Sequence, residues 1–152
     1  MDHNYWINLA IEKSAENLDG LAGGPFGAVI VKDDRLVAAT ANKVEEQTDP
    51  TAHAEIQAIR NACKKLNTTD LKGCTIYTSC EPCPMCLGAI YWANIDEVFF
   101  AANREDAQSG GFDDKIIYDE MEKKINNRKI PMKQLDNDKA KKIFELWIEK
   151  NK

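Results

Sequence analysis

The sequence lacks an apolar run long enough to cross a membrane. Its longest apolar stretches, such as Phe26 to Val31, have the length of a buried strand, whereas a membrane-spanning helix needs about 20 residues. It also lacks a basic leader followed by an apolar segment, because the chain opens with Met1-Asp2-His3-Asn4. These two absences argue against membrane insertion and against export, and we expect a cytoplasmic protein.

The sequence also lacks internal repeats, low-complexity stretches and an obvious linker. A chain of 152 residues is long enough for one buried core and too short for two ordinary domains. Its 43% apolar and 30% charged residues are typical of a globular protein. We therefore expect a single domain over residues 1–152.

The chain has no overall excess of positive charge. Its net charge of −5 disfavours tight binding to a polyanion such as nucleic acid. The charge is uneven, since residues 1–114 carry −9 and residues 115–152 carry +4. A basic tail keeps a nucleic-acid partner open as an alternative, although such a face is more often simply solvated.

The five cysteines cannot all pair in disulfides within one chain, because their number is odd. Three of them, Cys80, Cys83 and Cys86, are crowded into one short segment. In a reducing cytosol such a cluster indicates metal binding or catalysis rather than disulfide formation. Cys63 and Cys74 fit buried apolar positions instead.

Apolar periodicity predicts alternating helices and strands after an opening hairpin. The expected helices are an N-terminal segment that ends before Gly20 and residues 51–66, 84–92, 116–125 and 140–149, and the expected strands are residues 26–31, 36–41, 74–79 and 98–101. Thr51 is the expected cap of the second helix, and Asp33-Asp34 is the expected hairpin turn. This order predicts a layered α/β domain with a mixed sheet.

A histidine and two cysteines have the spacing of zinc ligands. His53 is followed two residues later by Glu55, and about 30 residues further on by Pro82, Cys83 and Cys86. Three protein ligands leave the fourth tetrahedral position open, which distinguishes a catalytic zinc site from a closed structural one. Both ligand sets are expected at helix N-termini, where the partial positive charge favours thiolates. This pattern is typical of zinc-dependent deaminases of nucleobases.

Glu55 is placed to act as a proton carrier beside the metal. Zinc lowers the pKa of bound water to about 7 and so makes hydroxide available at neutral pH. A carboxylate two residues from a ligand could take the proton of that water and pass it to the substrate. The expected reaction is hydrolytic deamination.

Other interpretations of these residues remain. The Cys-x-x-Cys pair could belong to a structural zinc-binding module, and Cys80 could make a fourth ligand. Cys80, Cys83 and Cys86 also have the spacing of part of an iron–sulfur ligand run, but the fourth cysteine of such a run is missing.

The sequence resembles the cytidine-deaminase-like superfamily and, within it, the bacterial guanine deaminases. The resemblance covers most of the chain, and it rests on residues 23–31 (GGPFGAVIV), 49–55 (DPTAHAE), 77–93 (from YTSCEP to WA) and 111–114 (GFDD). It implies a three-layer α/β/α fold with a central mixed five-stranded sheet, one zinc ion per chain and conversion of guanine to xanthine and ammonia.

The resemblance also implies residue roles. It assigns the metal to His53, Cys83 and Cys86, and proton transfer to Glu55, with Asp114 as a second acidic group at the substrate. It assigns contacts with the base to Asn42, Phe26, Trp92 and Ala54. From the residues alone, Phe26 and Trp92 could equally be core residues, and either Asp113 or Asp114 could cap the next helix.

The same resemblance implies a homodimer with exchanged C-terminal segments. The bacterial guanine deaminases carry an aromatic residue at the C-terminal end that closes the partner's site, whereas here the last aromatic residue is Trp147. A tRNA adenosine deaminase and a cytosine or other small-base deaminase remain as alternatives with the same zinc chemistry. The charge of −9 over residues 1–114 argues against a surface that binds a polynucleotide.

Overall fold

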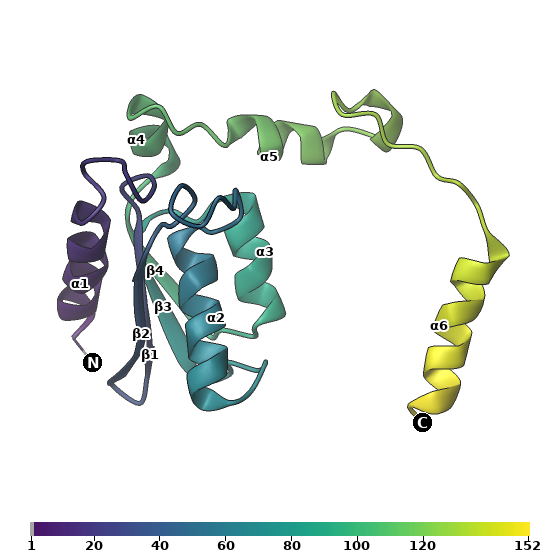
Figure 1. Cartoon of the computed structure of the whole chain (residues 1–152), viewed down its shortest axis with the longest axis horizontal. Coiled ribbons are helices and arrows are strands. Elements are labelled where there is room, and N and C mark those ends of the chain that lie inside the picture. The colour runs from purple at the N-terminus through teal and green to yellow at the C-terminus, as the bar shows by residue number, and fades with distance from the viewer. Residues whose placement is uncertain (1) are drawn as a thin grey trace. The chain divides into compact units, whose positions relative to one another are not determined.

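The computed structural model describes residues 2–152, and the chain divides into two compact units (Figure 1). The first unit ends at Lys115, and the second unit is Ile116–Lys152. The whole sheet lies in the first unit. The division into two units does not decide whether residues 1–152 act as one deaminase domain. That expectation stays a prediction.

The sheet of the first unit has the strand order β2-β1-β3-β4. Its strands are β1 (Gly27–Lys32), β2 (Arg35–Ala41), β3 (Cys74–Cys80) and β4 (Glu97–Ala102). β1 pairs antiparallel with β2 and β3, while β3 pairs parallel with β4. The prediction of an α/β fold with a mixed sheet is confirmed. Asp33 and Asp34, with φ of 51° and 58°, form the expected hairpin turn, since such short loops require positive φ.

The expected fifth strand is wrong, because residues 2–152 form four strands. The segment after β4 turns into the helix α4 (Arg104–Ser109), which the apolar pattern did not predict. Asn103 and Asp106 form a capping box that starts this helix, and such a box satisfies two free backbone N–H groups. The remaining chain forms α5 (Lys115–Glu122), η1 (Ile125–Asn127) and α6 (Asp138–Lys150).

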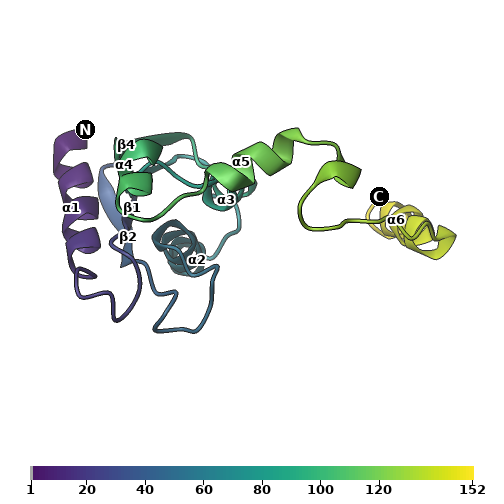
Figure 2. The ribbon, with the colours of Figure 1, turned by 90° about the horizontal axis from the view of Figure 1, so that it is seen from above.

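Helices cover both faces of the sheet in the first unit (Figure 2). One face packs on α1 (His3–Ala15), and the other on α2 (Ala54–Leu66), which also contacts α3 (Pro84–Trp92). Alternate residues of β1 enter the two cores, since Val29 and Val31 join the α1 side and Ala28 and Ile30 the α2 side. The arrangement gives three layers.

The predicted helices are present with small shifts of their ends. α2 begins at Ala54 with His53 as its N-cap, so the expected cap Thr51 is wrong. Thr51 instead hydrogen-bonds the Asp49 side chain in the preceding turn. Across the described residues, every helix is too short or too polar to span a bilayer.

Candidate active site

Three predicted metal ligands converge where α2 and α3 begin. His53 and Cys83 are the N-cap residues of these helices, and Cys86 lies in the first turn of α3. The Nδ1 atom of His53 is 3.6 Å from the Cys83 sulfur and 3.5 Å from the Cys86 sulfur. The ligand atoms all lie within 4.8 Å of one another. One ion can therefore reach all three.

The turn before His53 is fixed by Asp49. Its carboxylate accepts hydrogen bonds from the Thr51 backbone N–H at 2.8 Å and from the Thr51 hydroxyl at 2.7 Å. The Asp49 carbonyl also accepts the N–H of Ala52 at 3.0 Å. These bonds set the direction from which the chain enters α2, and therefore where His53 is presented.

Proximity among the three side chains changes their pKa values. Hydrogen bonding from the Cys86 thiol lowers the pKa of Cys83 to about 4, and the same hydrogen bond raises the pKa of Cys86. The pKa of His53 is raised, chiefly because it hydrogen-bonds Cys83. The two sulfur atoms and the imidazole nitrogen that share these hydrogen bonds face one point, where a cation could bind. Two sulfurs and an imidazole are a donor set that zinc prefers, so the residues fit this metal.

Glu55 is the buried acid beside the cluster. It lies in the first turn of α2, is only 7% exposed, and burial raises its pKa to about 7. Its carboxyl group also interacts with the Cys86 side chain. A carboxyl with a pKa near neutrality can both accept and donate a proton under ordinary conditions.

Two predicted contacts with the substrate, Phe26 and Asn42, flank the first sheet strands. Asn42 directly follows β2, and its N–H donates to the Phe26 carbonyl at 3.0 Å. The Phe26 ring packs edge-to-face on Phe112, with centroids 5.0 Å apart. Phe26 is half-buried and partly packed on the α2 side of the core. It is thus both a core residue and an accessible aromatic surface.

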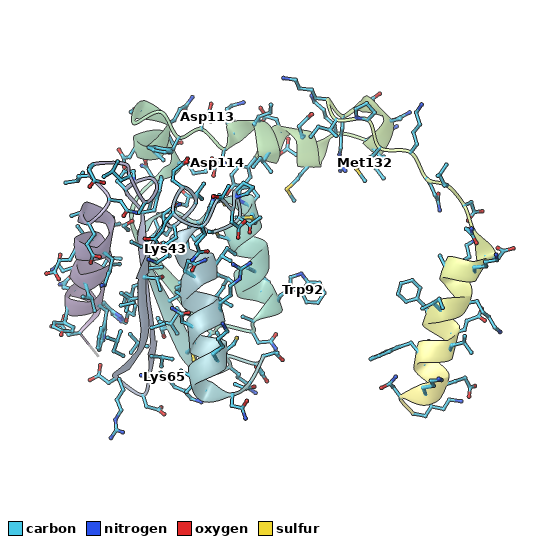
Figure 3. The ribbon with its side chains drawn as sticks, viewed as in Figure 1. Lys43, Lys65, Trp92, Asp113, Asp114 and Met132 are labelled. Carbon is cyan, nitrogen blue, oxygen red and sulfur yellow. The ribbon has the colours of Figure 1, made fainter. Side chains whose placement is uncertain are left out.

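Asp113 and Asp114 lie between α4 and α5, at the end of the first unit (Figure 3). The Asp113 carboxylate accepts the Lys115 N–H at 2.9 Å. Asp113 therefore makes the side-chain hydrogen bond to the backbone at the start of α5. Partial burial raises the pKa of Asp114, and the negative charge of Cys83 acts in the same direction. The charge of Asp114 therefore interacts with that of Cys83, one of the candidate metal ligands.

Trp92 and Ala54 are placed differently from one another. Trp92 ends α3, at the opposite end from Cys83, and it is 88% exposed (Figure 3). The structure does not bring it together with the metal cluster. Ala54 adjoins His53 at the start of α2, and its carbonyl accepts the Thr40 hydroxyl at 2.7 Å. Base contacts by both residues stay predictions.

A cavity of about 380 Å³ lies between α1, α4 and the ends of β3 and β4. Its walls are largely apolar and include Phe26, Phe112 and Cys80. None of its lining residues is a metal ligand or Glu55. The cavity adjoins the candidate site through shared walls, but it is separate from the metal cluster.

Two polar residues near the site were not among the site residues expected from the sequence. Asn17 and Asp49 both hydrogen-bond backbone groups of the segments that carry site residues. A single Asn or Asp in a loop is common in turns, so neither had a spacing signal. Asp49 is part of the 49–55 motif, but the resemblance assigned it no role.

The family comparison agrees with this geometry. The profile of the cytidine and deoxycytidylate deaminase zinc-binding region matches residues 1–102. This chain belongs to that family. A guanine deaminase from Bacillus subtilis is 48% identical over 147 residues, which cover 97% of this chain and 94% of the relative.

Structural comparison extends the family likeness to the full chain. The X-ray structure of the guanine deaminase from Bacillus subtilis matches with a TM-score of 0.94 and covers 98% of this chain and 95% of that chain. A tRNA-specific adenosine deaminase from Aquifex aeolicus is 40% identical over 102 residues, or 67% of each chain.

Proposed function

We propose that this protein hydrolyses guanine to xanthine and ammonia, with one zinc ion per chain. The observation that carries the proposal is the 48% identity to a guanine deaminase over 97% of the chain, joined to the convergence of the three ligands in this structure. The tRNA-specific adenosine deaminases match at lower identity, with 40% over 102 residues for the protein from Aquifex aeolicus and 34% over 149 residues for the one from Buchnera aphidicola. The enzyme is thus a zinc-dependent aminohydrolase.

His53, Cys83 and Cys86 would hold the metal. When bound there, zinc lowers the pKa of a water molecule to about 7 and so supplies a nucleophile at neutral pH. Three protein donors are the number found at catalytic zinc sites, whereas structural sites use four. Cys80 is not needed for this set, because its sulfur donates to the Asn103 carbonyl at 3.6 Å.

Glu55 moves the protons of the reaction. It accepts a proton from the attacking water and delivers it to the ring nitrogen beside C2 of guanine. It then carries the second proton of that water to the departing amine, so that the C2–N bond breaks and ammonia leaves. The buried position and raised pKa of Glu55 support both directions of transfer.

The remaining site residues orient the base in this proposal. Asn42 donates to the polar edge of guanine, Phe26 contacts its plane, and Ala54 lies beside it at the start of α2. Asp114 provides a second acidic group. Trp92 lines the pocket only if a second subunit completes the site around the end of α3. Planar bases are held by this combination of aromatic and amide groups in enclosed sites.

We further propose a single deaminase domain over residues 1–152 that works as a homodimer with exchanged C-terminal segments. α6 supports this proposal, because four of its apolar residues recur at helical spacing and are exposed (Ile143, Phe144, Trp147 and Ile148). An amphipathic helix normally buries such a stripe. Trp147 is then the available aromatic residue for closing the partner's site.

Ammonia release from a panel of free bases, nucleosides and tRNA tests the proposed function. We expect rapid release from guanine and much slower release from adenine and cytosine, since a mismatched base leaves buried polar groups unpaired at about 1–3 kcal/mol each. Activity on adenosine in a tRNA loop without activity on guanine would reject the guanine assignment and leave only the zinc chemistry. Salt-dependent tRNA binding would accompany that outcome.

A further inference from the structure

Asn17 joins two segments of the proposed substrate pocket. It lies just after α1 and is only 5% exposed. Its side-chain amide nitrogen donates to the Gly24 carbonyl at 3.0 Å and to the Asn42 carbonyl at 2.8 Å. An amide nitrogen has two N–H groups, and here both are used on these two backbone acceptors.

The two carbonyls belong to the segments that carry the proposed base contacts. Gly24 is two residues before Phe26, and Asn42 is itself a proposed contact. The two segments are also bonded directly, because the Asn42 N–H donates to the Phe26 carbonyl. Asn17 therefore adds a third chain segment that holds Phe26 and Asn42 at a fixed separation.

The side chain of Asn42 is oriented by its own neighbours. Its Oδ1 atom accepts the Val44 N–H at 3.0 Å, which identifies the oxygen and leaves Nδ2 as a donor. Gly23 makes room for this arrangement, since a Cβ atom there would collide with Asn42 Oδ1. Displacing the Asn42 backbone would break the hydrogen bond with Val44 and disturb the close packing against Gly23.

We propose that Asn17 is a positioning residue for substrate recognition, which acts by fixing Asn42 so that its amide donor meets the carbonyl edge of the base. The inference rests on the proposed guanine substrate. Asn17 does not itself contact the reacting atoms, because both of its N–H groups are occupied by backbone carbonyls. Its effect should therefore appear in substrate binding rather than in the chemical step.

Asn17→Asp is the sharpest variant, because it keeps the side-chain shape and replaces the double donor with an acceptor facing two carbonyls. We expect the KM for guanine to rise about tenfold or more, as for the loss of buried hydrogen bonds, with a smaller change in kcat and unchanged zinc content. Asn17→Ala serves as a second variant if the aspartate prevents folding.

A matched control separates positioning from general loss of stability. Asn67 ends α2 with a left-handed φ of 53°, so Asn67→Ala strains the backbone away from the pocket. We expect this control to lower the melting temperature and to leave the KM for guanine unchanged. An unchanged KM in both Asn17 variants, or an equal KM rise in the control, would overturn the positioning role.

A base without the carbonyl shows whether Asn17 acts through Asn42. 2-Aminopurine keeps the amine on C2 but has hydrogen on C6, and its affinity is measured as a competitive inhibition constant. Asn17→Asp should weaken 2-aminopurine far less than guanine, and it should add little to Asn42→Ala in the double variant. Equal weakening of both bases, or additive losses, would overturn the route through Asn42. If the wild-type enzyme leaves guanine unchanged, the proposed function fails as well. If the wild type deaminates guanine and the Asn17 variants behave like it, only the positioning role fails and the proposed function stands.

Discussion

The two units of the chain differ in whether their apolar side chains are buried. In the first unit, two clusters of buried residues lie on the faces of the sheet, including Ile30, Ile76 and Tyr77 with no exposed surface. In the second unit, no described residue is buried, and large apolar side chains such as Phe144 and Trp147 are 72% and 66% exposed. The first unit has a buried core of its own, whereas the residues described in the second unit form none.

The proposed catalytic residues and the exposed apolar helix lie in different parts of the sequence. Every proposed catalytic or binding residue from Phe26 to Asp114 belongs to the first unit. The second unit contributes apolar residues at helical spacing, of the kind that mark protein–protein contacts when they remain exposed. Changes in the first unit should therefore act on metal and turnover, and changes in the second on assembly and on the proposed closure of the partner's site.

The largest effect is expected from Cys83→Ala, which tests the first unit as the metal-binding part. Removing one of three ligands should lose the zinc and with it all measurable deamination. Metal analysis of the purified protein measures the outcome. Cys80→Ala is the matched control and should keep close to one zinc per chain. Unchanged zinc in Cys83→Ala, or iron–sulfur absorbance in the wild type, would contradict the ligand assignment.

Glu55→Gln should have the next largest effect and should divide metal binding from catalysis. The amide keeps the size of the side chain but cannot carry protons, so we expect kcat to fall by about 10²–10⁴-fold. Zinc content should stay at the wild-type level. A variant with near-normal turnover would show that another group performs the proton transfer.

Asp114→Asn tests the last proposed site residue of the first unit. We expect turnover to fall about tenfold, as for the loss of one charged interaction, while the melting temperature changes little. Asp113→Ala is the comparison, because Asp113 accepts the Lys115 N–H and its loss should reduce stability rather than turnover. The reverse pattern would assign capping to Asp114.

Paired changes in α6 test the second unit. Replacing Phe144 and Trp147 with serine should convert the proposed dimer to monomers, because burying each aromatic side chain contributes about 1.5–3 kcal/mol to association. Light scattering at several protein concentrations measures the mass. Glu145→Ser, on the same helix, should leave the dimer intact. A wild-type protein that is monomeric at all concentrations would rule out the exchanged dimer.

The sequence predicted most of the first unit, because its signals are local. Apolar runs located all four strands of the sheet, and motif spacing located His53, Glu55, Cys83 and Cys86. The fifth strand came from the resemblance alone, and it failed where the capping box at Asn103 starts a helix. The contacts of Asn17 could not be predicted, because they join residues that are 7 and 25 positions apart without any periodic pattern.

The smallest expected effect concerns the turn that precedes His53. Hydrogen bonds from Thr51 lower the pKa of Asp49 below its ordinary value of 3.8. A carboxylate with a lowered folded-state pKa stabilises the fold above its unfolded pKa, and this contribution is lost as the pH falls through the lowered value. Asp49→Asn should therefore slightly destabilise the protein at pH 7, and this effect should shrink as the pH falls below the ordinary pKa of 3.8. Urea denaturation of metal-free wild type and variant from pH 7 down to the acid limit of the fold measures this change, with Asp19→Asn as a loop control. A stability difference that does not change with pH would show that Asp49 contributes shape to the turn and not charge.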